Sequence, residues 1–378
     1  MMSHPASLQS RRRTGRRYTI LLFIVLALIA GWTGFWKFAA GKAQETIDGW
    51  RLREAKAGRV YTCDSQSVGG YPFRIEVNCD RASALFRSNQ PPVELKANGL
   101  MIVAQVYQPG LLISEFHGPL TIGESGKTPD FIADWTLAQS SVRGTPAAPQ
   151  RASLVFDGLA VDRMVGTARQ NILRAKHIEF HSRIADGSAA NKPVIEIAMQ
   201  LNQASAPALH PGATQPIDAN VTAVLRGLND FSPKPWSVRF REMQSEGGHI
   251  DITQARMQQG EILAVGVGTL SINGNGRLEG QLRVTMAGLD QFLAAIGAQQ
   301  RVQTSPNMDK LVGALDRLAP GLGDVARQQA GANISLGINM LGEQTTLEGK
   351  RAVTLPLRFT DGAIFLGPIP IGNAPALF

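Results

Sequence analysis

An uncharged run of 19 residues, Tyr18 to Trp36, constrains this chain more than any other feature of its sequence. As a helix, a run of this length is about 28 Å long, close to the roughly 30 Å hydrocarbon core of a bilayer. Trp32, Phe35 and Trp36 gather at its far end, as aromatic residues do at a membrane interface. The sequence therefore predicts a transmembrane anchor at residues 18–36.

A cluster of arginines precedes this run and predicts its orientation. The first 17 residues contain no acidic side chain and carry five basic ones, Arg11, Arg12, Arg13, Arg16 and Arg17. By the positive-inside rule, residues 1–17 are a basic cytoplasmic segment and the rest of the chain lies across the membrane. These arginines account for most of the net charge of +8, so the remainder is close to neutral and we expect no nucleic-acid partner.

A cleaved signal peptide is the alternative interpretation, because Gly41-Lys42-Ala43 resembles a small-x-small cleavage site. The apolar run is longer than that of a usual signal peptide and ends in bulky aromatic residues, which favours an uncleaved anchor. Residues 37–58 carry a loose apolar stripe among charged residues and are expected to form a juxtamembrane helix.

Two cysteines, Cys63 and Cys79, flank a turn signal of Gly69-Gly70 followed by Tyr71-Pro72. A hairpin that folds at the glycines can bring Cys63 beside Cys79 on a buried strand face. In an oxidising compartment we expect a disulfide between them. Two buried free thiols are the alternative, and the spacing excludes a catalytic C-x-x-C pair.

Beyond Tyr61, apolar residues recur at every second position, as in strands with one buried face. The clearest examples are 195–202, 236–241, 278–286 and 353–359. Further strands are expected at 93–107, 131–143, 152–162, 173–184, 220–228 and 261–272. Helical patterns return only near 288–330, with stretches at 288–298 and 307–329. The sequence thus predicts a mainly β fold, in which residues 59–378 form a large, mostly antiparallel, curved sheet.

The sequence contains none of the nucleophile-elbow, zinc-protease, Walker A or dinucleotide-binding motifs. In His177-Ile178-Glu179-Phe180-His181, two imidazoles and a carboxylate share one face of a strand. Residues four apart on a strand are about 13 Å apart, too far to share an ion. We therefore interpret this segment as a solvated face, and we expect no enzyme activity, no metal and no cofactor.

Three segments resemble a known family. GGYPFRIEVNC around Cys79, GTLSINGNGRLEGQLRVTMAGLDQFL at 268–293 and LPLRFTDGAIFLGPIPIG at 355–372 resemble the uncharacterised bacterial family catalogued as domain of unknown function 2125. That resemblance implies a protein anchored in the inner membrane of Gram-negative bacteria with its β-rich domain in the periplasm, and implies no activity. Strands reading G-x-L-x-I followed by G-x-L-x-G-x-L are more loosely similar to AsmA-like proteins, a resemblance that implies envelope lipid traffic.

At least ten expected strands face only two short helical stretches, so an apolar sheet face is expected to stay uncovered by helices. Large exposed apolar patches are rare without a ligand, membrane or partner. We therefore expect lipid or another amphiphile to bind in a sheet groove, with Leu282, Val284 and Met286 as candidate lining residues. The alternative is a structural or assembly scaffold for an envelope complex, without a ligand groove. The expected partners are the inner membrane and either lipid or envelope proteins.

Overall fold

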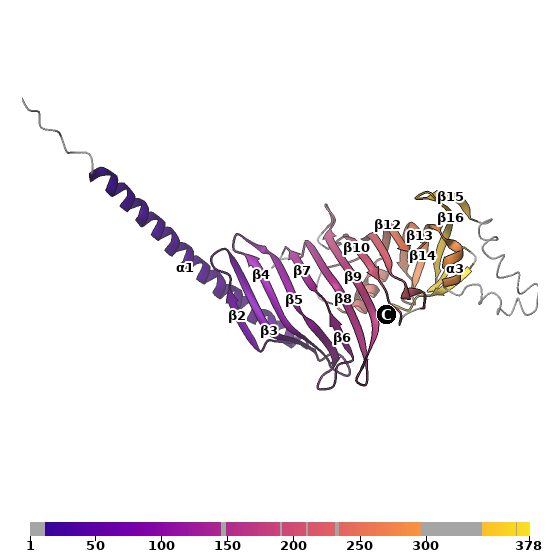
Figure 1. Cartoon of the computed structure of the whole chain (residues 1–378), viewed down its shortest axis with the longest axis horizontal. Helices are drawn as coiled ribbons and strands as arrows, with labels where there is room; N and C mark the ends of the chain where they lie inside the picture. Colours follow the sequence, from indigo (N-terminus) through magenta and orange to yellow (C-terminus); the bar gives the residue numbers. More distant parts are fainter. Residues whose placement is uncertain are drawn as a thin grey trace, which may run out of the picture.

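One long helix and one large antiparallel sheet make up most of the fold (Figure 1). The structure, a computed structural model, describes residues 12–144, 149–189, 191–208, 211–230, 234–295, 342–367 and 369–378. The helices are α1 (Arg12–Lys56), α2 (Trp236–Ser245), α3 (Leu289–Ala295) and a 3-10 turn, η1 (Pro211–Thr214). The mainly β architecture predicted from the alternation of apolar residues is confirmed.

The strands follow one another with few interruptions. In chain order they are β1 (Arg59–Thr62), β2 (Ser65–Gly69), β3 (Arg74–Phe86), β4 (Val93–Gln105), β5 (Gln108–Glu124), β6 (Phe131–Asp134), β7 (Leu137–Arg143), β8 (Arg151–Val165), β9 (Ala168–Ile184), β10 (Ile195–Ala204), β11 (Ile217–Leu225), β12 (His249–Gln259), β13 (Ile262–Ile272), β14 (Leu278–Ala287), β15 (Glu343–Leu347), β16 (Lys350–Thr360), β17 (Ala363–Leu366) and β18 (Ile369–Asn373).

The sheet is a meander, because neighbouring strands are almost always consecutive in the chain and antiparallel. From β8 to β14 each strand pairs with the next. At one end β1 and β2 both pair with β3, and the short β6 and β7 together bridge β5 and β8. At the other end β16 pairs with β14, β15 and β17. Short connections of this kind favour antiparallel neighbours.

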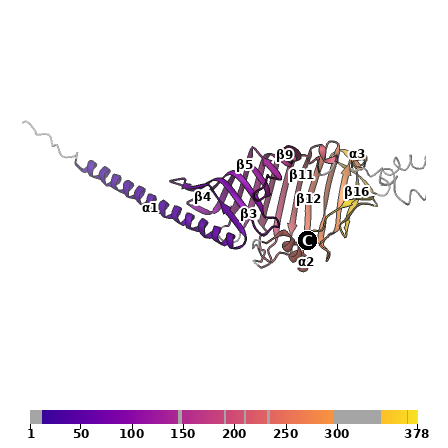
Figure 2. The ribbon, with the colours of Figure 1, turned by 90° about the horizontal axis from the view of Figure 1, so that it is seen from below.

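The sheet is elongated across its strands, with α1 and α3 at its two ends. Figure 1 shows α1 beside β2 and β3 at one end and α3 beside β14 at the other. Seen from below, β9 to β16 stand side by side, whereas β3 and β4 cross at a different angle, so the sheet twists along its length (Figure 2). Such twist is the usual consequence of the handedness of the strands.

Helix α1 divides into two parts by exposure. Residues 16–31 are all exposed, and α1 is the one described helix that is long and apolar enough to cross a membrane. The remainder runs along the sheet edge, where Gln66 donates a hydrogen bond to Gln44 at 2.8 Å and the rings of Trp50 and Tyr61 stack at 4.7 Å. The juxtamembrane segment is thus a continuation of the same helix, and it packs on the domain.

The strand predicted at 236–241 is wrong, because this segment forms α2. Trp236, Phe240 and Met243 recur with the helical spacing of four and three residues, and Met243 is fully buried beneath the helix. An ion pair between Arg239 and Glu242, three residues apart at 3.4 Å, adds support on another side of the helix. Apolar and polar residues do alternate over these six positions, but six residues are too few to distinguish a strand from a helix.

The helical prediction near 288–330 is tested only at its start. Helix α3 lies inside it, with Leu289 and Leu293 buried against the sheet. The second predicted stretch, 307–329, lies outside the described residues.

Candidate functional site

One face of the sheet carries no charged side chain along three neighbouring rows of cross-strand partners. Directly opposed residues in an antiparallel pair share a face, so the register defines these rows. The first row is Ala138, Phe156, Ile178, Leu201, Ala219, Met257, Ala264, Met286 and Val353. The second is Val77, Ile102, Ser114, Ser140, Leu154, Phe180, Met199, Val221, Ala255, Gly266, Val284 and Leu355. The third is Ile75, Ala104, Leu112, Val142, Ala152, Ser182, Ile197, Ala223, Ile252, Gly268, Leu282, Leu357 and Leu366.

We refer to these three rows as the apolar face. The second row crosses every neighbouring strand from β3 to β16, which at about 4.8 Å per strand amounts to about 50 Å along the sheet. Serine, glycine and alanine are its smallest members, and the others are large aliphatic, aromatic or methionine side chains. The apolar face is therefore continuous from the α1 end of the sheet to the α3 end.

The three residues predicted to line a groove lie together on this face. Leu282, Val284 and Met286 are alternate residues of β14, and each belongs to a different row. All three are buried, with at most 9% of each residue exposed, in a cluster that includes Leu289 and Leu293 of α3. At this end, the apolar face is packed as a protein core.

The middle of the apolar face is more open. Phe180 on β9 and Met199 on β10 are directly opposed, and each is 36% exposed. In the described part of the chain, α1 makes its main contacts with β1 to β3 and α3 with β13, while Met243 of α2 packs in a cluster near the ends of β10 to β13. Between these ends the sheet presents large apolar side chains that are only half-buried.

The opposite face of the same strands, referred to below as the charged face, carries charged and polar side chains among apolar ones. The row next to Phe180 and Met199 runs through Glu179, Gln200, Asn220 and Arg256. Arg256 forms an ion pair with Glu348 at 3.0 Å. This face is the more polar of the two, and the absence of charge along the three rows singles out the apolar face as a candidate binding surface.

The histidine segment on β9 lies on the charged face, and its polar groups bind one another. The Nδ1 of His177 is 2.6 Å from the Asp157 carboxylate, and Glu179 lies between His177 and His181. The hydrogen bond to Asp157 raises the pKa of His177, against the opposing effect of burial. Among the described residues, no group of three or more His, Cys, Asp and Glu side chains is arranged to hold a metal ion.

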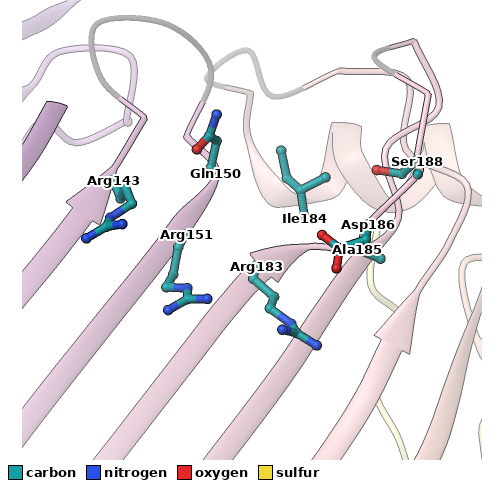
Figure 3. A pocket seen from close by; sticks show the side chains of 9 residues that line it. Arg143, Gln150, Arg151, Arg183, Ile184, Ala185, Asp186 and Ser188 are labelled. Carbon is teal, nitrogen blue, oxygen red and sulfur yellow. The ribbon is translucent and has the colours of Figure 1, made fainter.

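Three arginines line a shallow polar pocket at the ends of β7, β8 and β9 (Figure 3). Arg143 opposes Arg151, and Arg151 opposes Arg183. Arg183 is neutralised by Glu196 at 2.5 Å. Two like charges, Arg143 and Arg151, therefore oppose each other directly at this pocket, and the carboxylate of Asp186 also lines it.

Cys63 and Cys79 form a disulfide, with their Cα atoms 5.4 Å apart. The bond joins the segment after β1 to the middle of β3, and the guanidinium of Arg51 from α1 donates to the sulfur of Cys63 at 3.0 Å. The predicted pairing is confirmed, and it lies on the part of the fold that contacts α1.

Phe180 and Met199 were not predicted as site residues from the sequence. Both were visible only as members of alternating strands, because their prominence depends on the register between β9 and β10 and on which strands the helices cover. An alternating pattern can mark a face as apolar, but the exposure of that face is a tertiary property.

Comparison with known families identifies the chain by its sequence. A family described as an uncharacterised protein conserved in bacteria, DUF2125, matches residues 36–375, and the chain belongs to it. No curated protein matches the chain. The family resemblance expected from the GGYPFR and LGPIP segments is thereby confirmed.

Proposed function

We propose that this protein is a single-pass protein of the bacterial inner membrane whose periplasmic β-domain binds lipid or another amphiphile on the apolar face. In this proposal, α1 is the anchor, the arginines before it stay in the cytoplasm, and the protein acts in envelope maintenance or lipid traffic. The disulfide supports the periplasm, because such bonds persist in oxidising compartments. The proposal assigns no catalytic step and no cofactor.

Retention of α1 is supported by its contacts with the domain. Trp32 and Trp36 donate hydrogen bonds to backbone carbonyls of the β2–β3 turn. Cleavage at Gly41-Lys42-Ala43 would remove both contacts and leave the sheet edge without half of its covering helix. A signal peptide has no such structural role in the mature protein.

The observation that carries the lipid proposal is the half-open middle of the apolar face. Phe180 and Met199 expose more than a third of their surface within an uncharged row about 50 Å long. An acyl chain on this row would remove apolar surface from water, at roughly 25 cal/mol per Å². Because the anchor holds the domain beside a bilayer, lipid is the nearest apolar ligand.

The experiment compares two neighbouring residues of β10 that lie on opposite faces. Met199→Asp places a carboxylate on the apolar face, and Gln200→Asp places the same group on the charged face. A charge against an acyl chain is strongly unfavourable, so Met199→Asp is expected to release the lipid that native mass spectrometry detects on the wild type and on Gln200→Asp. Circular dichroism should be unchanged in both variants, since neither residue is fully buried.

Two results would contradict the lipid proposal. One is a wild-type protein that carries no lipid after mild exchange of detergent. The other is equal lipid retention by Met199→Asp and Gln200→Asp. Copurification of a stoichiometric envelope protein that Met199→Asp alone releases would favour the alternative function, an assembly scaffold whose apolar face binds a protein.

A further inference from the structure

Two tryptophans on successive turns of α1 are tied to the turn between β2 and β3. The indole N–H of Trp32 donates to the carbonyl of Pro72 at 2.8 Å, and that of Trp36 donates to the carbonyl of Arg74 at 2.8 Å. Between them, the hydroxyl groups of Thr33 and Tyr71 are 2.9 Å apart. The turn is thus fixed to the last residues of the apolar run.

The turn itself is held in a tight shape by glycine. Gly70 has a φ of +94°, and its carbonyl accepts a hydrogen bond from the backbone N–H of Arg74 at 3.1 Å. A Cβ atom at Gly70 would lie only 2.8 Å from atoms of Arg74, so a larger residue would force the turn to move. The turn therefore presents its aromatic side chains in a defined direction.

These aromatic side chains are exposed although they contact α1. Tyr71 is 49% exposed and its ring lies 5.6 Å from that of Trp36, while Phe73 is 64% exposed and lies 6.3 Å from Trp32. The turn between β4 and β5, at the same ends of the strands, adds Tyr107, which is 70% exposed. Its turn is held beside the first by a hydrogen bond from the backbone N–H of residue 106 to the carbonyl of Phe73 at 3.0 Å.

We define the aromatic collar as Trp32, Trp36, Tyr71, Phe73 and Tyr107. We propose that the aromatic collar lies in the interface of the phospholipid bilayer and docks the rim of the β-domain onto the membrane surface. The inference rests on the proposed retention of α1 as a membrane anchor. It adds a second, direct contact between the sheet and the bilayer.

Position and chemistry both support a lipid surface as the partner. Residues 16–31 of α1 are exposed along the apolar run, and the two indoles stand where that run ends. Tryptophan and tyrosine favour the headgroup level of a bilayer because one end of the ring is apolar and the other is polar. Tyr71 and Phe73 contact these indoles, so they lie close to the same depth.

The collar also has a consequence for the apolar face. Ile75, the first residue of the third row, follows Arg74, whose carbonyl is bound to Trp36. The apolar face thus begins at the point where the sheet would meet the bilayer. A lipid that leaves the membrane beside α1 would reach the apolar face without crossing a charged surface.

The test places a photo-reactive benzoylphenylalanine at Phe73, at Tyr107 or at Val165 in the full chain, reconstituted into vesicles of phosphatidylethanolamine and phosphatidylglycerol. Val165 is the matched control, because it is a large apolar residue that is 57% exposed, but at the opposite ends of the strands. Irradiation followed by mass spectrometry is expected to give phospholipid adducts at positions 73 and 107 and none at position 165.

Two outcomes would overturn the inference. Absence of phospholipid adducts at 73 and 107 in a chain that stays in the membrane pellet after alkaline extraction refutes the docking and leaves the anchor and the apolar-face proposal intact. Adducts of equal yield at 73, 107 and 165 refute it as well, since contact would then be unspecific. Release of the chain by alkaline extraction refutes the anchor, and the docking with it.

Discussion

Two methionines of the apolar face, Met286 and Met199, should respond differently to truncation to alanine. Met286 is 5% exposed and packs in the cluster with α3, so Met286→Ala leaves a cavity. Buried substitutions of this kind cost about 2–5 kcal/mol. Met199 is 36% exposed, and truncation there leaves no closed cavity. Since full burial of such a side chain contributes roughly 1.5–3 kcal/mol, Met199→Ala should cost about 1 kcal/mol in the lipid-free protein.

The assay is urea unfolding of the full chain in mild detergent, followed by far-ultraviolet circular dichroism. Added phospholipid should increase the loss of unfolding free energy caused by Met199→Ala, because the wild type then gains ligand contacts that the variant lacks. It should leave the loss caused by Met286→Ala unchanged. Equal costs for the two variants in lipid-free protein would refute the distinction between a packed end and an open middle.

Three further predictions concern the disulfide, a histidine and the topology. Replacing Cys63 and Cys79 together by serine should lower the free energy of unfolding by about 3 kcal/mol in the chain-entropy description, and free thiols in protein isolated from cells would contradict the bond. The hydrogen bond to Asp157 raises the pKa of His177, so the protonated form of His177 stabilises the folded state. This stabilisation is complete at pH values below about 6.5, the pKa of histidine in the unfolded chain. That contribution is lost as the pH rises through the folded pKa, so His177→Asn should flatten the fall in stability above pH 6.5, and an unchanged pH profile would refute the assignment. Alkaline phosphatase fused after Phe378 should be active, whereas an inactive fusion would contradict a periplasmic domain.

The secondary structure was largely predictable from sequence because half-buried strands impose a period of two on their side chains. The predicted strand at 173–184 lies within β9 and that at 261–272 matches β13 to within one residue. The chemistry of the cysteine pair was predictable for a similar reason, since two cysteines across one turn have few alternatives. These inferences needed only local pattern.

What the sequence did not predict depends on contacts between distant residues. The prediction of a strand at 236–241 was wrong because the residue that reveals the helical spacing, Met243, lies beyond the alternating residues. Met243 is buried by tertiary packing, which the local pattern does not show. Phe180 becomes a candidate site residue only through its pairing with Met199 in the next strand, which the sequence does not show. The aromatic collar joins residues about 40 positions apart, from α1 and the β2–β3 turn, and no local pattern indicates that pairing.

The claim that the apolar face binds lipid is tested most directly by photo-crosslinking in living cells at Phe180. Benzoylphenylalanine at position 180 reports what touches the open middle of the apolar face, and the same group at Gln200 reports on the charged face one strand away. Phospholipid or another acyl-bearing adduct is expected at position 180, and none is expected at position 200. A protein adduct at position 180 would contradict the claim that the apolar face binds lipid. The absence of any adduct at 180, or the same adducts at 180 and 200, would contradict it as well.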